Sequence, residues 1–175
     1  FSDRDDVRVA VLTGAGKVFC AGADIKERIG LVKKPGDYWR HNRGAREYAN
    51  AIRECKKPVI AAVNGAALGA GFGVMSACDI MLASDNATFG MPEIDVGLAG
   101  GCAFISRLFG KSRGRRIVFT GERFSAAELY RLGVIEWCGP REQLMDEAMK
   151  IARNIASKSP LAIKLAKEAY NVVEN

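Results

Sequence analysis

Residues 58–73 read PVIAAVNGAALGAGFG, a short apolar run followed by a stretch with four glycines among its last ten residues. The run from Val59 to Val63 is typical of a buried strand. The glycine-rich part predicts a turn that opens a helix from Ala70 to about Ala77. Because glycine costs roughly 0.5 to 1 kcal/mol relative to Ala inside regular structure, this density indicates backbone that must approach something closely.

The rest of the chain alternates strand, turn and helix in the same way. Further strands are predicted at Val7 to Thr13, Asp79 to Ala83 and Ala87 to Phe89. Helices are predicted to begin near Asp24 and to cover 36–57, 70–77, 103–109, 112–120, 125–132, 141–157 and 160–173. This alternation predicts an α/β fold with mainly parallel pairing early in the chain and helices late.

Length and composition favour one ordinary globular domain. The chain has 175 residues, of which 49% are hydrophobic, and no apolar run approaches the ~18 residues of a membrane span. Its start has no signal-peptide pattern, so we expect a cytoplasmic protein. The first residue is Phe1 rather than Met, which leaves room for an upstream segment and for targeting to the mitochondrial matrix. The net charge of +6 favours polyanionic partners in general.

Several common kinds of catalytic site are disfavoured by the residue inventory. The five cysteines form no CxxC pair, and with a single histidine they argue against a zinc site and for reduced thiols. A Ser-His-Asp triad would have to use His41, which lies in a polar stretch, and GxSxG is absent. Gly110-Lys111-Ser112 resembles the end of a phosphate loop, but Ile105 stands where that loop requires glycine.

Three motifs together point to a different chemistry. CAGADI (20–25) and ALGAGFG (67–73) are strand-to-helix turns of small residues, and FGMPEIDVGLAGG (89–101) follows them. Each turn offers backbone N–H groups at a helix start, and two such donors that converge on one point form an oxyanion hole. Small residues also allow tight packing of a helix on a strand, which is the structural alternative for either turn alone.

Four segments resemble the enoyl-CoA hydratase/isomerase (crotonase) superfamily in the same order. They are FCAGADIKE (19–27), KKPVIAAVNGAALGAGFG (56–73), CDIMLASDNATFGMPEIDVGL (78–98) and FTGERFSAAELYRLGVIE (119–136). The resemblance runs through essentially all 175 residues. It implies a single crotonase-like domain over 1–175, with a spiral of repeated ββα units in 1–120 and a helical region in 121–175. The usual family domain has further N- and C-terminal parts that this chain lacks, and the family forms homotrimers or homohexamers.

The resemblance also implies what approaches the glycine-rich backbone, namely the thioester carbonyl of an acyl-CoA. The N–H groups of Ala23 and Ala70 match the two oxyanion-hole positions. The other implied acyl-CoA contacts, several of them in the loop for the adenine and ribose of CoA, are Ala21, Asp24, Ile25, Lys26, Gly69 and Gly101. Coenzyme A enters as part of the substrate, and no separate cofactor or metal is implied.

Glu93 matches the catalytic carboxylate of the family. The second glutamate of a standard hydratase would stand at position 73, which is glycine here. Hydration needs a held water, a base and an acid, whereas moving a double bond needs one carboxylate that removes a proton and returns it elsewhere. The sequence therefore slightly favours an isomerase with Glu93 as its single acid/base, and a hydratase with a second acid elsewhere is the alternative. Asp95, two residues on, would share the face of Glu93 on an extended segment and is a weak candidate for that acid.

A non-catalytic alternative rests on a cluster of basic residues. Its members are Arg107, Lys111, Arg113, Arg115 and Arg116. RNA binding occurs in the superfamily, but aromatic residues for stacking are sparse in the cluster, which argues against a nucleic-acid partner. Cys102 as a nucleophile is also disfavoured, because nothing nearby in the sequence would lower its pKa.

Overall fold

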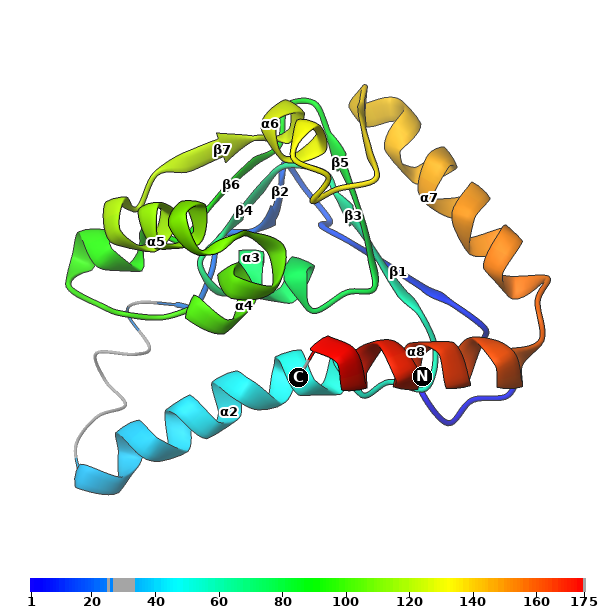
Figure 1. The fold of residues 1–175 in the computed structure, drawn as a ribbon, viewed down its shortest axis with the longest axis horizontal. Helices are drawn as coiled ribbons and strands as arrows, with labels where there is room; N and C mark the ends of the chain where they lie inside the picture. The colour runs from blue at the N-terminus through cyan, green and yellow to red at the C-terminus, as the bar shows by residue number, and fades with distance from the viewer. Residues whose placement is uncertain (25, 27–33, 175) are drawn as a thin grey trace.

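The computed structural model describes residues 1–24, 26 and 34–174, and its strands form two four-stranded sheets (Figure 1). The first sheet has the order β1 (Ala10–Thr13), β3 (Val59–Val63), β5 (Ile80–Ser84), β8 (Trp137–Gly139), and all its pairs are parallel. The second has the order β2 (Val18–Cys20), β4 (Ala66–Leu68), β6 (Thr88–Gly90), β7 (Arg123–Ser125). Only its last pair, β6 with β7, is antiparallel among these strands.

From β1 to β6, consecutive strands alternate between the two sheets, so the chain winds as a spiral. Each turn of the spiral places one strand in the first sheet and the next in the second. In the second turn, β3 and β4 are followed by α3 (Ala70–Ser76). This arrangement confirms the predicted α/β fold with parallel pairing.

Helices surround the sheets and follow the predicted spans closely. They are α2 (Pro35–Arg53), α3, α4 (Cys102–Leu108), α5 (Lys111–Thr120), α6 (Ala126–Arg131), α7 (Arg141–Ala156) and α8 (Pro160–Glu174). The helix expected near Asp24 falls mainly on residues outside the described part. The short strands β2, β4, β7 and β8 were not predicted, and two of them lie within 121–175, so that region contains strands as well as helices.

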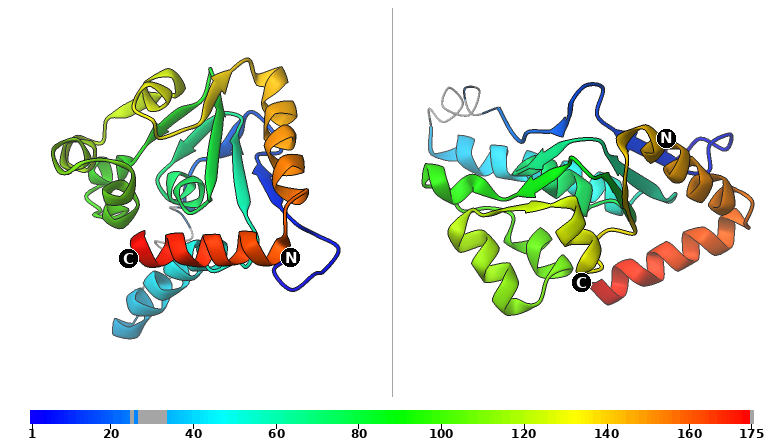
Figure 2. Two further views of the ribbon diagram at one scale, coloured as in Figure 1. Left: turned by 45° about the vertical axis from the view of Figure 1, so that its right-hand side comes forward. Right: turned by 90° about the horizontal axis from the view of Figure 1, so that it is seen from above.

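The alternation of side chains along β3 divides the core in two. Val59, Ala61 and Val63 face the main core, which also holds residues of the second sheet and of α3. Ile60 and Ala62 face the opposite side, where α7 covers the first sheet (Figure 2). Every residue of β3 is buried, which explains why the strand reads as a continuous apolar run.

Asn64 fixes the turn between β1 and β2 against the end of β3. Its buried side chain accepts a hydrogen bond from the Gly14 N–H (2.9 Å) and donates to the carbonyls of Gly14 (3.1 Å) and Gly16 (2.8 Å). A Cβ on the next residue, Gly65, would lie 2.0 Å from the Lys17 carbonyl oxygen. Asn64 and Gly65 therefore hold the segment that leads into β2 directly against the end of β3.

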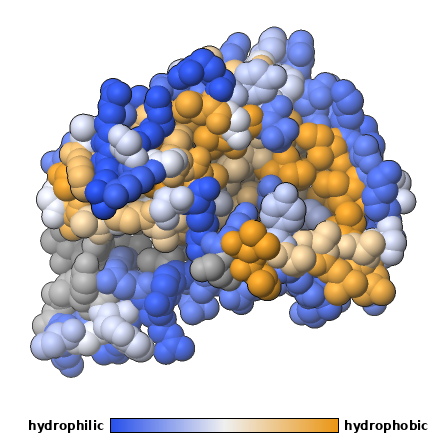
Figure 3. Space-filling model, viewed as in Figure 1, coloured by the Kyte–Doolittle hydropathy of each residue, from blue (hydrophilic) through white to orange (hydrophobic). Residues whose placement is uncertain are grey.

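Hydrophobic side chains also remain on the outside of α8 (Figure 3). The most exposed of them are Leu161, Leu165, Tyr170, Val172 and Val173.

In the described part of the chain, no helix has both the length and the apolar character needed to cross a membrane. All five cysteines are free thiols.

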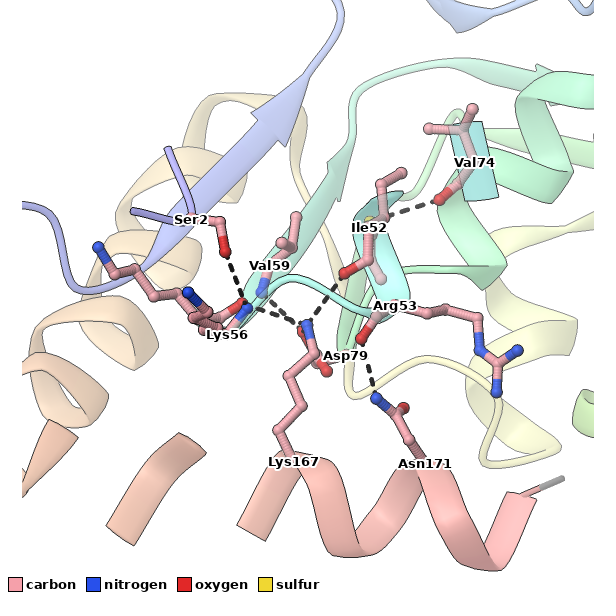
Figure 4. Close-up of polar contacts among 11 residues, drawn as sticks. Ser2, Ile52, Arg53, Lys56, Val59, Val74, Asp79, Lys167 and Asn171 are labelled. Atoms are coloured by element: carbon pink, nitrogen blue, oxygen red, sulfur yellow. Dashed lines mark hydrogen bonds and ion pairs between the residues drawn. The ribbon is translucent and has the colours of Figure 1, made fainter. Parts of the chain in front are cut away.

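A buried lysine joins α8 to the spiral (Figure 4). Nζ of Lys167 donates to the carbonyls of Ile52 and Lys57, both at 3.1 Å, and to Oδ2 of Asp79 at 2.8 Å. The same Asp79 oxygen accepts a hydrogen bond from the Val59 N–H at 2.7 Å. The lysine side chain is only 5% exposed. One ammonium group therefore connects α8, the segment after α2, and the starts of two central strands.

We expect Lys167→Met to lower the free energy of unfolding by about 3 kcal/mol. The substitution would leave the Asp79 carboxylate without its cation and the carbonyls of Ile52 and Lys57 without the donor that Lys167 provides. The matched control is Lys164→Met, one turn earlier on α8, whose ion pair with Glu168 is largely exposed at 3.6 Å. Its loss should change stability by less than about 0.5 kcal/mol. Urea unfolding of both variants measures the difference, and equal effects would contradict the assignment.

Candidate active site

The turn before Ala23 lies directly against the start of α3. Gly22 has a φ of +107°, and a Cβ on it would lie 3.0 Å from the Leu68 carbonyl oxygen and 3.6 Å from the Ala70 nitrogen. Both features require glycine at this position, because a side chain would be strained and would enter the narrow space. The residue before Ala23 is therefore brought against Ala70, which carries the other predicted oxyanion donor.

The end of β2 packs equally closely on the first turn of α3. A Cβ on Gly71 would lie 2.0 Å from the carbonyl oxygen of Cys20 and 2.8 Å from its Cβ. Gly71 is buried, and the atom that it approaches is backbone, which cannot rotate away as a side chain would. The contact explains one of the glycines in ALGAGFG and fixes the distance between the two turns.

The backbone around Ala70 leaves its N–H at the beginning of a helix. Gly69, the residue before α3, has a φ of +55° and donates its own N–H to the Gly90 carbonyl at 2.9 Å. The first helical bond of α3 runs from the Gly73 N–H to the Gly69 carbonyl at 3.0 Å. The amide of Ala70 therefore precedes the helical hydrogen bonds and is available to an acceptor from outside the helix.

Glu93 brings its carboxylate to this same place from the second sheet. It lies on the 3-10 helix η1 (Pro92–Val96), which follows β6. A Cβ on Gly69 would lie 2.8 Å from Oε1 of Glu93, and Oε2 exposes less than 1 Å². The carboxylate thus lies against the residue that precedes Ala70, where the absence of a side chain makes room for it.

Gly73, the position at which a second carboxylate was sought, faces two aromatic residues. A Cβ there would lie 2.8 Å from the Tyr48 hydroxyl oxygen and 2.9 Å from Cε2 of Phe104. A glutamate at this position would therefore require both rings to move. The space above Gly73 already contains a polar group, the Tyr48 hydroxyl.

The Tyr48 phenol is held in its neutral form. Burial raises the pKa of Tyr48, and the negative charge of Glu93 raises this pKa further. A neutral phenol donates one hydrogen bond and accepts others. Tyr48 lies within the predicted 36–57 helix, and the sequence analysis did not single it out as a site residue; a polar tip among the apolar positions of that helix was the available signal.

The remaining predicted acyl-CoA contacts lie around these turns. Ala21, Asp24 and Lys26 are exposed, and the Lys26 N–H donates to Oδ1 of Asp24 at 2.8 Å. Ile25 lies outside the described residues. Gly101 has a φ of +70° and precedes α4, where a Cβ would overlap the end of the Met91 side chain.

Asp95 does not share the face of Glu93. The prediction assumed an extended segment, but Pro92 opens a 3-10 helix, in which residues two apart point in different directions. The Asp95 carboxylate lies beside Gly121 instead, where a Cβ would be 2.8 Å from Oδ1. Asp95 was therefore wrongly considered as a second acid.

The basic cluster lies on α4, which carries Arg107, and on α5, which carries its other members. Arg113 pairs with Glu128 and Arg116 with Glu122, each at 2.8 Å. These carboxylates partly neutralise the cluster, so it offers a polyanion less charge than the sequence suggests.

Known proteins resemble this chain in both sequence and fold. The family model for enoyl-CoA hydratase/isomerase matches residues 1–173. The chain belongs to this family. A solved structure of enoyl-CoA hydratase from Bacillus anthracis superposes with a TM-score of 0.89 at 39% identity, covering 97% of this chain and 67% of the other. The crotonase-like fold predicted from the sequence is thereby confirmed.

Relatives of similar identity carry different reaction names. The chain is 41% identical over 174 residues to a Dictyostelium discoideum protein named "Probable enoyl-CoA hydratase, mitochondrial", covering 98% of this chain and 61% of the relative. It is 39% identical over 171 residues to "(7aS)-7a-methyl-1,5-dioxo-2,3,5,6,7,7a-hexahydro-1H-indene-carboxyl-CoA hydrolase" of Mycobacterium tuberculosis, covering 97% and 68%. The chain thus spans about two thirds of the length of these family members. Identity at this level does not select one reaction within the family.

We expect Gly71→Ala to lower the free energy of unfolding by about 3 kcal/mol, because its Cβ would overlap the Cys20 carbonyl and the two turns would have to separate. The control is Gly44→Ala on the exposed face of α2, where an added Cβ meets nothing within 4 Å. That change should raise stability by about 0.5 to 1 kcal/mol. Thermal or urea unfolding tests both; a harmless Gly71→Ala would contradict the close contact.

Proposed function

We propose that this chain carries the active site of an acyl-CoA enzyme that moves a double bond through a thioester enolate, with Glu93 as its acid/base. The observation that carries the proposal is the position of the partly buried Glu93, whose Oε1 lies against Gly69, the residue before Ala70, and whose Oε2 is shielded from solvent. Gly73 on the next turn provides no acid. Isomerisation of a 3-enoyl thioester to the 2-enoyl form is therefore favoured over hydration.

The proposed reaction needs one proton and one base. The Glu93 carboxylate removes a proton from C2 of the 3-enoyl thioester, and the electron pair moves into a dienolate whose negative charge lies on the thioester oxygen. The protonated carboxyl group then returns the proton to C4, and the double bond re-forms between C2 and C3. The number of protons on the enzyme is the same before and after.

The amides of Ala23 and Ala70 would stabilise the enolate oxygen. Fixed donors that point at a developing charge act without reorganisation, and each contributes about 2.7 to 4 kcal/mol on mutational precedent. The close contact of Gly22 with the backbone at Leu68 and Ala70 supports this role, because it keeps the two donor-bearing turns at a constant separation. Ala21, Asp24, Ile25 and Lys26 would hold the nucleotide of CoA, with Gly69 and Gly101 near the acyl group.

Hydration is the second candidate. The hydratase name of the Dictyostelium relative favours it, as does the Tyr48 hydroxyl above Gly73, which supplies a polar group where a second carboxylate is missing.

The homotrimer or homohexamer implied by the family resemblance is also part of the proposal. The exposed apolar side chains of α8 are available for such contacts.

We expect Glu93→Gln to abolish both double-bond movement and exchange of acyl C2 or C4 protons with D₂O, because an amide does not accept the proton at neutral pH. Wild type should convert a 3-enoyl-CoA faster than it hydrates the matched 2-enoyl-CoA. Spectrophotometric assays and proton NMR in D₂O measure these rates. Asp95→Asn is the matched control and should leave them unchanged; exchange that survives in Glu93→Gln would refute the assignment.

We expect Ala70→Pro to reduce kcat by about 10² to 10³, because it removes one of the two proposed oxyanion donors. Ala70 is the first residue of α3, a position at which proline is compatible with a helix. Lys111→Pro makes the same change at the first residue of α5, an exposed position with no proposed role in the reaction, and should retain activity. Circular dichroism checks that both variants fold, and full turnover by a folded Ala70→Pro variant would exclude this donor.

A further inference from the structure

Tyr48 reaches the proposed reaction site from a helix that carries none of the residues assigned to it so far. Its hydroxyl oxygen would lie 2.8 Å from a Cβ on Gly73, and the Phe104 ring bounds the same space at 2.9 Å. Gly73 is buried on the inner side of α3. The phenol group therefore enters a confined space in which a polar atom needs a polar neighbour or a water molecule.

The phenol and the Glu93 carboxylate lie along the same side of α3. Oε1 of Glu93 approaches Gly69, and the Tyr48 hydroxyl approaches Gly73. The two glycines are one helical turn apart and are joined by the hydrogen bond from the Gly73 N–H to the Gly69 carbonyl at 3.0 Å. The charge of Glu93 also raises the pKa of Tyr48, so the two groups lie within electrostatic reach of each other. The site thus presents a base and a neutral hydroxyl on consecutive turns, next to the amide of Ala70.

A hydroxyl in this place suits a particular task in hydration. A water that attacks a 2-enoyl thioester must give one proton to a base and point a lone pair at C3, so its second hydrogen needs an acceptor that fixes its orientation. The Tyr48 oxygen can accept that hydrogen bond without taking the proton. A neutral acceptor holds the water more weakly than a second carboxylate would.

We propose that the Tyr48 hydroxyl positions the water that this site adds to C3 of a 2-enoyl thioester, and so sets the ratio of hydration to double-bond movement. The inference rests on the proposed function. Glu93 takes one proton from the water as its oxygen bonds to C3, and the C2–C3 π electrons move into the enolate. Glu93 then returns that proton to C2, and the Tyr48 O–H bond is never broken.

The test is Tyr48→Phe in the full chain, assayed on a matched pair of 2-enoyl and 3-enoyl thioesters. The variant removes one oxygen and keeps the ring, so the packing against Gly73 is retained. Hydration should fall about tenfold, the equivalent of one lost hydrogen bond. Isomerisation and D₂O exchange should change less than about twofold, since Tyr48 takes no part in those steps. The control is Tyr170→Phe, a tyrosine on α8 that is 73% exposed, which should alter neither rate.

Gly73→Ala provides a second, independent variant. Its Cβ would displace the Tyr48 hydroxyl, so it should lower hydration in the same direction, and Tyr48→Phe added to it should have little further effect. Equal losses of both reactions in Tyr48→Phe would indicate a purely structural role and overturn the inference. Unchanged hydration in Tyr48→Phe, or isomerisation without measurable hydration in wild type, would overturn it as well.

The same assays separate this inference from the proposed function. If wild type shows no Glu93-dependent turnover and no exchange of acyl protons with D₂O, the proposed function fails, and the role of Tyr48 fails with it. If Glu93-dependent exchange is intact but the ratio of hydration to isomerisation does not respond to Tyr48→Phe, only the role of Tyr48 is refuted.

Discussion

Two backbone segments touch where β2 ends and α3 begins, and the candidate site is arranged around this contact. Gly71 meets the Cys20 carbonyl, and Gly22 meets the backbone of Leu68 and Ala70. Any side chain at either glycine would separate the segments and the two amides proposed to act together. Each glycine costs roughly 0.5 to 1 kcal/mol in regular structure, but no other residue permits such a close approach of the two backbone segments.

The topology then determines which carboxylate reaches these amides. Because β4 and β6 are parallel neighbours, their carboxyl ends meet at one edge of the second sheet. The chain after β4 becomes Gly69 and α3, and the chain after β6 becomes Glu93 on η1. The hydrogen bond from Gly69 to Gly90 continues the pairing by one step and holds both exits together. A spiral of paired strands thus brings residues distant in sequence to one point, as open α/β sheets generally do at the carboxyl ends of their strands.

The sequence predicted the long elements and the motif residues, but not the features created by packing alone. β3, α7 and α8 have enough residues for periodicity to show, whereas β2, β4, β7 and β8 have three residues each and are defined by their partners. Asp95 was misjudged because η1 is not extended. Tyr48 was not recognised as a site residue because its helical spacing fits a core position equally well, and the packing of α2 on α3 is what brings its hydroxyl to Gly73.

The replacement of a possible second carboxylate by a phenol changes the electrostatics of the site. Two adjacent carboxylates oppose each other's ionisation, so a site built from such a pair has to share protons between them. Here the charge of Glu93 helps to keep Tyr48 protonated, because it raises the pKa of the phenol. In the proposed reactions, proton transfer therefore falls to Glu93, while the neutral Tyr48 hydroxyl can donate or accept hydrogen bonds. A site that works in this way would retain the base that enolate chemistry needs and would hold water less strongly than a pair of carboxylates. Under the proposed function, a substitution next to Gly73 that moves or removes the Tyr48 hydroxyl would therefore change the ratio of hydration to double-bond movement while leaving the base, Glu93, in place.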